Sequence, residues 1–139
     1  MDLGLKGKVA LVTGGSKGIG FAIAQALAEQ GCSLRLVARD LASLEEAQRT
    51  LKQEFPVEVL IHSANLSIPG STDEVALAFP ETDILINSAG AVARGGLLDL
   101  DPNGFREGFE GKVMSSMMLS RALYPHMVAK KYGVIINII

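Results

Sequence analysis

One short turn organises this chain, and its sequence is Thr13-Gly14-Gly15-Ser16-Lys17-Gly18-Ile19-Gly20. The apolar run before it, Val9–Val12, has the length and β-branched content of a buried strand. After the turn, apolar residues recur at the spacing of one helix face, at Phe21, Ile23, Ala24, Leu27 and Ala28. A helix that starts directly after such a strand directs its first backbone amides, and the positive end of its dipole, at the turn. We therefore interpret the turn as a binding site for a pyrophosphate group.

The glycine spacing of the turn separates several nucleotide-binding motifs. Glycines at positions 14, 18 and 20 give Thr-Gly-x-x-x-Gly-Ile-Gly, which differs from the general dinucleotide pattern Gly-x-Gly-x-x-Gly. A P-loop needs Gly-Lys-Ser/Thr at the start of the helix, and Lys17 is followed here by Gly18, which disfavours a nucleoside triphosphatase. A glycine turn with only a structural role is the other interpretation, and the flanking strand and helix argue against it.

At these residues the chain resembles the short-chain dehydrogenase/reductase family, whose cofactor turn has this spacing after the first strand. The resemblance implies a nicotinamide dinucleotide bound beyond the carboxyl ends of a parallel sheet. It also implies that residues of the turn contact this cofactor, namely Gly14, Ser16, Lys17, Gly18, Ile19 and Gly20. A nucleotide-sugar epimerase of the related extended group is an alternative, which the turn and the segment Asn87–Gly90 disfavour.

The composition is that of a globular protein, because 48% of the 139 residues are hydrophobic and 20% are charged. A formal net charge of −2 gives no basic field for nucleic acid or an anionic membrane. The N-terminal segment lacks the apolar region of a signal peptide, and no apolar run approaches the length of a membrane span, so we expect a soluble cytoplasmic protein. Cys32, the only cysteine, is expected in the core, and His62 and His126 have no second ligand at a metal-site spacing.

Strand and helix patterns alternate along the chain. Apolar runs predict strands at 8–13, 33–38, 57–62, 83–87 and 134–139, and helical periodicity predicts helices at 18–30, 41–55, 70–79 and 101–131. Asp40 and Asp101 are expected to cap two of these helices, and Pro125 is expected to bend or interrupt the last one. Strands that are apolar on both faces indicate a parallel sheet covered by helices on both sides. We therefore predict one α/β domain over 1–139, a doubly wound Rossmann fold with strand order 3-2-1-4-5.

The end of the second predicted strand distinguishes the two nicotinamide cofactors. An acidic residue there would bind the free 2′-hydroxyl of the adenosine ribose and repel a 2′-phosphate. This chain has Arg39 instead, whose planar guanidinium pairs well with phosphate, and Lys17 in the turn can add a second positive charge. Asp40 comes one position later, where it is placed to cap a helix. We therefore predict NADP(H) rather than NAD(H), although each of the two positive charges taken alone is also typical of a solvated surface residue.

Two further segments resemble cofactor contacts of the family. Asn65 and Leu66 fall where the family has an Asp-Val/Leu pair that holds the adenine ring, and the amide oxygen of Asn65 can still accept a bond from the adenine amino group. Asn87-Ser88-Ala89-Gly90 resembles the family's Asn-Asn-Ala-Gly, in which Ala89 and Gly90 would let the nicotinamide half lie against the backbone. Asn87 has two compatible interpretations, a cofactor-binding residue and a tie between neighbouring loops.

The family's catalytic residues are the part of the resemblance that this chain does not carry. The family uses a serine after the fifth strand and a later Tyr-x-x-x-Lys, and neither Tyr124 nor Tyr132 is followed four residues later by lysine. In the long helix, the family's asparagine position falls on Lys112, for which a solvated residue, a ligand of an acidic substrate group and a substitute for the missing lysine all stay open. An apolar segment at 134–139 would leave a bare edge strand, so we expect the chain to be one part of a longer domain.

The sequence thus predicts an NADP(H)-dependent oxidoreductase that moves a hydride between nicotinamide and the carbon of a carbonyl or alcohol substrate. Lys112 is the only local candidate for a catalytic role. The alternative is a dinucleotide-binding protein without catalysis that acts as a redox sensor or scaffold, which the departures at Asn65 and Lys112 keep open. By resemblance alone we also expect a homo-oligomer, a dimer or tetramer that associates through the long helix.

Overall fold

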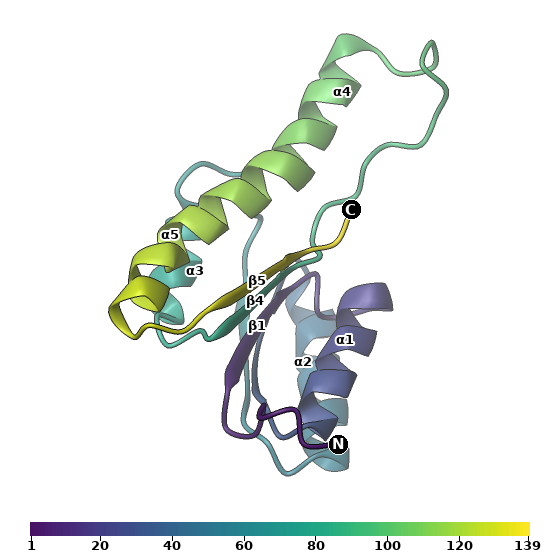
Figure 1. Ribbon diagram of the computed structural model, residues 1–139. Coiled ribbons are helices and arrows are strands. Elements are labelled where there is room, and N and C mark those ends of the chain that lie inside the picture. The colour runs from purple at the N-terminus through teal and green to yellow at the C-terminus, as the bar shows by residue number, and fades with distance from the viewer.

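A computed structural model of residues 1–139 contains a five-stranded parallel sheet with helices on both faces (Figure 1). The strands lie in the order β3-β2-β1-β4-β5, which confirms the predicted topology. The elements in chain order are β1 Val9–Thr13, α1 Gly18–Glu29, β2 Ser33–Ala38, α2 Leu41–Glu54, β3 Val59–Ser63, α3 Ser71–Ala78, β4 Ile84–Asn87, α4 Pro102–Phe109, the π-helical segment η1 Glu110–Met114, α5 Ser115–Ala129 and β5 Val134–Asn137.

The two faces of the sheet carry separate hydrophobic clusters. Successive strand residues point to opposite faces, so one cluster contains Val12, Leu36 and Ile86 and the other contains Leu11, Val37 and Leu85. Helices α1 and α2 cover the first cluster, and α3 and α5 cover the second (Figure 1). All of these strand residues are buried. The strands are apolar on both faces because the parallel sheet lies between two layers of helices, as the sequence predicts.

Two of the helices begin at the capping residues that the sequence predicts. The Asp40 carboxylate accepts a hydrogen bond from the Ser43 amide at 3.1 Å, and Asp101 accepts one from the Gly104 amide at 2.8 Å. Pro102 follows Asp101 at the start of α4, where an amide hydrogen would have no partner within the helix. Each carboxylate therefore satisfies an amide that the first helical turn leaves unpaired.

The long C-terminal helix differs from its prediction. α4, η1 and α5 follow one another without a break, and α5 continues through Pro125 as far as Ala129, so the predicted interruption at Pro125 is wrong. Proline removes its own bond to the carbonyl of Arg121, and both residues are exposed, so water can solvate that carbonyl. The departure from α-helical geometry lies instead at Glu110–Met114, where the helix widens by one π-helical turn.

Several strand ends also differ from the predicted ranges by one or two residues. β1 begins at Val9, β3 covers Val59–Ser63 and β5 ends at Asn137. Val57 lies outside β3 because its amide bonds to the Phe55 carbonyl at 2.9 Å and not to the neighbouring strand. A strand ends where its pairing hydrogen bonds end, and a local apolar pattern does not define that position.

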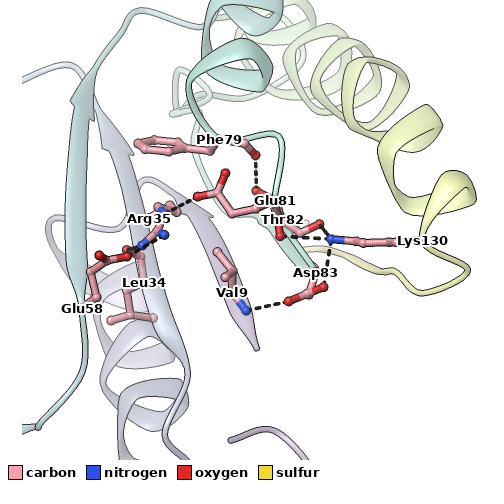
Figure 2. Close-up of polar contacts among 9 residues, drawn as sticks. All are labelled: Val9, Leu34, Arg35, Glu58, Phe79, Glu81, Thr82, Asp83 and Lys130. Carbon is pink, nitrogen blue, oxygen red and sulfur yellow. Dashed lines mark hydrogen bonds and ion pairs between the residues drawn. The ribbon is translucent and has the colours of Figure 1, made fainter. Parts of the chain in front are cut away.

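A buried arginine lies near the amino ends of the strands (Figure 2). The Arg35 side chain, in β2, is 6% exposed and pairs with Glu58 at 2.7 Å and with Glu81 at 2.8 Å. Its guanidinium also lies 5.8 Å from the centre of the Phe79 ring. The two carboxylates come from the segments that lead into β3 and β4, so the charge of Arg35 is neutralised at the rim of the sheet opposite the glycine turn.

Asp83 joins three elements at the same rim (Figure 2). One carboxylate oxygen accepts a hydrogen bond from the Val9 amide at 2.9 Å, and the other pairs with the Lys130 ammonium at 2.9 Å. Lys130 also donates to the carbonyls of Glu81 and Thr82, at 3.0 Å and 2.8 Å. The residue after α5 is thereby connected to the starts of β1 and β4.

These contacts predict a pH-dependent contribution of Asp83 to stability. Burial raises the pKa of the Asp83 carboxyl, but the hydrogen bonds and charge of Lys130, together with the Val9 amide, outweigh burial and hold the pKa below its usual value. Because the pKa is lower in the folded state, the stabilisation is complete above about pH 4, the pKa of an ordinary aspartate. It is lost as the pH falls through the folded-state pKa.

Asp83→Asn is therefore expected to lower the free energy of unfolding by about 1–2 kcal/mol at pH 7 and by much less at pH 2–3. Urea unfolding at a series of pH values measures this difference directly. Glu45→Gln, at an exposed position of α2 without a hydrogen bond or ion pair from its side chain, is the matched control. A deficit of Asp83→Asn that stays constant with pH would contradict the assignment of the carboxylate as the stabilising form.

Candidate functional site

The glycine turn lies between the end of β1 and the start of α1, as predicted. The Gly14 amide donates to the Val37 carbonyl at 2.7 Å, which ties the turn to the end of β2. α1 begins at Gly18 without a side-chain cap and without an acidic residue in its first turn. The first amides of this helix therefore have no protein acceptor and can bind an anion.

The turn closes on itself at Gly20. A Cβ atom at this position would overlap the carbonyl oxygen of Gly14, so that only glycine allows the helix to approach the turn this closely. A Cβ at Gly18 would meet no atom within 4 Å, so the side of the turn at the helix N-terminus is open. Ile19, beside it, is 65% exposed and offers an apolar surface at the mouth of the site.

The loop after β4 lies directly against the glycine turn. A Cβ on Gly14 would stand 3.1 Å from the Cα and amide nitrogen of Ala89. The buried Thr13 hydroxyl accepts hydrogen bonds from the amides of Ser88 at 3.1 Å and Ala89 at 3.0 Å. Sequence patterns assign Thr13 no role of its own, and the only available signal is a hydroxyl at the last residue of an apolar strand. Two segments that are distant in sequence thus lie side by side at the carboxyl ends of β1 and β4, the edge at which the fold predicts a ligand crevice.

Asn87 ties together the elements on either side of it. Its side chain is buried, and its amide nitrogen donates to Ser120 Oγ at 3.1 Å and to Asn137 Oδ1 at 2.9 Å. β4 is thereby connected to α5 and to β5. Asn87 thus ties β4 to a helix and a strand, where the sequence suggested a tie between loops, and direct cofactor contact by its side chain stays a prediction.

The charges near the end of β2 are arranged as the cofactor argument requires. Arg39 is exposed, and its guanidinium makes no hydrogen bond or ion pair with the rest of the chain. Asp40 caps α2, and the hydroxyl and amide of Ser43, with a smaller contribution from the nearby Lys17 ammonium, lower the pKa of its carboxyl. The acidic residue is therefore engaged within the protein, whereas the arginine is free for a ligand.

Asn65 and Leu66 follow the end of β3. The Asn65 side-chain oxygen accepts a hydrogen bond from the Ser67 amide at 3.1 Å, so one of its two lone pairs is already used. Leu66 is half-buried and packs on the hydrophobic cluster beneath α3 and α5. The Ala64 amide bonds to the Ala38 carbonyl at 2.9 Å, which brings this loop beside the end of β2. Adenine binding by this pair stays a prediction.

Lys112 lies within η1 and points toward the loop after β4. Its ammonium donates to the Ala89 carbonyl oxygen at 3.2 Å, and its side chain is half-buried. Burial lowers the pKa of this lysine. The interpretation of Lys112 as a solvated helix residue is therefore wrong, because the widened helical turn places it against the crevice.

Two cavities flank the long helix. One, of about 570 Å³, lies between the segment 66–70 and the helix. The other, of about 530 Å³, is lined by Lys112 and Ser116 from the helix and by Asn137 and Ile139 from the end of the sheet. Lys112 lines the second cavity and donates to the Ala89 carbonyl, so this cavity adjoins the loop after β4, whereas Arg39 lies at the end of β2.

The structure also bears on a metal site, on the single cysteine and on membrane insertion. No group of three or more His, Cys, Asp or Glu side chains is arranged to hold a metal ion. Cys32 is buried, as predicted, and its thiol lies 3.4 Å from the Leu5 carbonyl oxygen. None of the helices has both the length and the apolar character that a membrane crossing requires.

Comparison with known proteins agrees with this geometry. The sequence model for short chain dehydrogenases matches residues 8–139. The uncharacterized oxidoreductase YvaG of Bacillus subtilis is 35% identical over 139 residues, which are 99% of this chain and 53% of that protein. The chain therefore spans about half the length of this relative.

Solved structures are similar as well. L-sorbose reductase from Gluconobacter frateurii, crystallised with NADPH and L-sorbose, has a TM-score of 0.93 and 38% identity over 99% of this chain and 54% of its own. A short-chain dehydrogenase from Sphingobium yanoikuyae in complex with NADPH has a TM-score of 0.86 and 31% identity over 94% of this chain and 52% of its own. These structures share the fold over 94–99% of this chain.

Proposed function

Because this chain belongs to the short chain dehydrogenase family, we propose that it forms the cofactor-binding part of an NADP(H)-dependent oxidoreductase. The proposed reaction is hydride transfer between the nicotinamide ring and the carbon of a small carbonyl or alcohol substrate. Nicotinamide supplies the hydride when it is bound, and the protein fixes its position relative to the substrate.

The glycine turn is the observation that carries this proposal. The first amides of α1 have no protein acceptor. No atom lies near the Cβ position of Gly18, so a ligand can approach there, whereas Gly20 packs directly on the Gly14 carbonyl. A pyrophosphate fits such a site because backbone amides and the helix dipole neutralise it without a side-chain cation. The Thr13 hydroxyl holds the loop after β4 in contact with the turn, and Asn87 anchors the end of β4 to α5 and β5, which supports this loop as a surface for the second half of the dinucleotide.

The preference for NADP(H) rests on the charges at the end of β2. Arg39 is exposed and unpaired, Lys17 is exposed in the turn, and Asp40 is engaged in capping α2. An unpaired guanidinium favours a 2′-phosphate, and no carboxylate stands at the position of Arg39 to accept a ribose hydroxyl. The NADPH present in two of the similar structures supports the same choice.

The cavity of about 530 Å³ is the candidate substrate site. It adjoins the end of the crevice that lies away from Arg39, where the nicotinamide half is expected. Its apolar lining, with Lys112, Ser116, Ser120 and Asn137 as polar groups, suits a small organic molecule. The group that exchanges a proton with the substrate oxygen is not assigned to any residue of this chain.

The expected homo-oligomer has a candidate contact surface on the long helix. Large apolar side chains lie along its exposed side, namely Phe105, Phe109, Tyr124 and Val128, and each is 46–61% exposed; Val113 and Met117, between them in sequence, line the cavity instead. Apolar residues at this spacing are typical of a helix that packs against another surface. Self-association and a cytoplasmic location both stay predictions.

The decisive experiment uses the full-length protein. NADPH and NADH are titrated into it, and the loss of nicotinamide absorbance is then followed with a panel of small aldehydes, ketones and keto sugars. We expect NADPH to bind at least about tenfold more tightly than NADH and to be oxidised with at least one carbonyl compound. Tight binding without turnover of any substrate would favour the non-catalytic alternative, and failure to bind either dinucleotide would reject the proposal.

A further inference from the structure

The loop after β4 packs backbone against backbone on η1. Gly90 has a φ of +103°, and a Cβ there would overlap the Gly111 carbonyl oxygen. A side chain of any size at position 90 would therefore separate the loop from the helix. The same Cβ would stand 3.1 Å from the Cα of Lys112, so the helix residue nearest to the loop is the one whose ammonium reaches the Ala89 carbonyl.

The π-helical turn fixes the direction of the Lys112 side chain. The hydroxyls of the two serines that follow it donate back to carbonyls of the widened turn. Ser115 Oγ lies 2.9 Å from the Gly111 oxygen, and Ser116 Oγ lies 2.7 Å from the Lys112 oxygen. The Gly111 and Lys112 carbonyls in the widened turn thus each accept a hydrogen bond from a serine hydroxyl. Hydrogen bonds within the long helix therefore fix the backbone at Lys112.

Ala89 is held on both sides. Its amide donates to the Thr13 hydroxyl at 3.0 Å, and its carbonyl accepts from the Lys112 ammonium at 3.2 Å. Thr13 belongs to β1, directly before the glycine turn, whereas Lys112 belongs to the long helix. Ala89 is therefore the point at which the glycine turn, the loop after β4 and the long helix are joined.

We propose that Lys112 is a positioning residue that holds the Ala89 carbonyl and thereby fixes the surface on which the nicotinamide half of NADP(H) lies. The inference rests on the proposed function and adds a role that acts on the cofactor through the loop. Lys112 has no carboxylate within ion-pair distance, so the Ala89 carbonyl is the only protein acceptor that orients its ammonium. Its partial burial strengthens that hydrogen bond.

A local effect of Lys112 on the cofactor can be distinguished from a general loss of stability, because the two ends of the cofactor bind at different places. Arg39 and Lys17 lie at the adenosine end, whereas Lys112 lies at the loop after β4. The fragment 2′,5′-ADP carries the adenosine and the 2′-phosphate but lacks the nicotinamide half, so it senses only the first end. NADPH senses both ends, and its nicotinamide fluorescence reports the surroundings of the ring.

The experiment compares Lys112→Met and Lys112→Arg in the full-length protein. Lys112→Met is expected to weaken NADPH binding about tenfold, the effect of losing one charge-assisted hydrogen bond, and to leave 2′,5′-ADP binding within about twofold. It should also reduce the change in nicotinamide fluorescence on binding. Lys112→Arg keeps a donor of similar reach and should restore most of both NADPH signals. Arg106→Met, at an exposed position of α4 that lines neither cavity, is the control that should change neither ligand.

Three results would overturn the inference. Unchanged NADPH affinity and fluorescence in Lys112→Met, with a weaker effect only on acidic substrates, would make Lys112 a substrate ligand instead. Equal weakening of NADPH and 2′,5′-ADP would indicate a general loss of structure, and failure of Lys112→Arg to recover would exclude the hydrogen bond as the cause. The proposed function would survive all three, because its own test is dinucleotide binding and carbonyl turnover by the unaltered protein.

Discussion

Gly20→Ala is expected to reduce NADPH affinity at least about 100-fold. The added Cβ would overlap the Gly14 carbonyl oxygen, so the turn and the first turn of α1 must move apart. The amides that bind the pyrophosphate would then no longer converge on one point. Losing two hydrogen bonds to a charged group, each worth about 1.5–3 kcal/mol, accounts for a change of this size.

Gly104→Ala supplies the matched control for Gly20→Ala. Gly104 also lies in the first turn of a helix, α4, but a Cβ there would come no closer than 3.4 Å to Asp101 Oδ1, an ordinary contact. Alanine is the better helix former by up to about 1 kcal/mol, so this variant should be equally or more stable and should bind NADPH normally. Isothermal titration and thermal unfolding of both variants separate lost binding from lost folding. Normal NADPH binding by a folded Gly20→Ala protein would refute the pyrophosphate site.

The topology could be predicted because each part of it has a local signal. A strand that is apolar on both faces requires helices on both sides, and Val12 and Leu11 indeed lie in opposite clusters. Parallel strands joined by helices take right-handed crossovers, which leaves few possible strand orders. The positions of Asp40 and Asp101 before their helices likewise follow from the pairing of a carboxylate with nearby amides.

Contacts between distant residues could not be predicted in the same way. Arg35 occupies a strand position that periodicity assigns to the core, and its partners Glu58 and Glu81 become neighbours only when β3 and β4 are placed. The Thr13 hydroxyl likewise becomes a hydrogen-bond acceptor for the Ser88 amide only when the fold places the two residues side by side. The spacing of residues along one element contains no information on such partners.

The long helix shows a second limit of sequence patterns. Pro125 is a strong local signal for an interruption, yet the helix tolerates it because the affected carbonyl lies on an exposed face. The π-helical turn at Glu110–Met114 has no comparable signal. It depends on the hydroxyls of Ser115 and Ser116 and on the loop that packs against Gly111. The position of Lys112 in the candidate site therefore required the structure.

Arg39→Asp is expected to weaken NADPH binding about 100-fold and to leave NADH binding within about threefold, which reverses the preference between the two cofactors. The guanidinium has no partner within the protein, so its replacement disturbs no folded contact. The new carboxylate repels a 2′-phosphate, and it can accept a hydrogen bond from the 2′-hydroxyl of NADH. Titration of both cofactors into the full-length variant gives the two dissociation constants directly.

Arg49→Asp separates the position of the charge from its sign. Arg49 is exposed on α2, away from the end of β2. Its replacement by aspartate changes the net charge by the same amount as Arg39→Asp. Because surface charges more than about 10 Å apart are largely screened at ordinary salt, Arg49→Asp should change NADPH affinity by less than about threefold. If the two variants weakened NADPH equally, the effect would come from net charge alone. If Arg39→Asp weakened NADPH and NADH to the same degree, Arg39 would contact a part of the dinucleotide that both cofactors share, and the preference for NADP(H) would have no basis at this position.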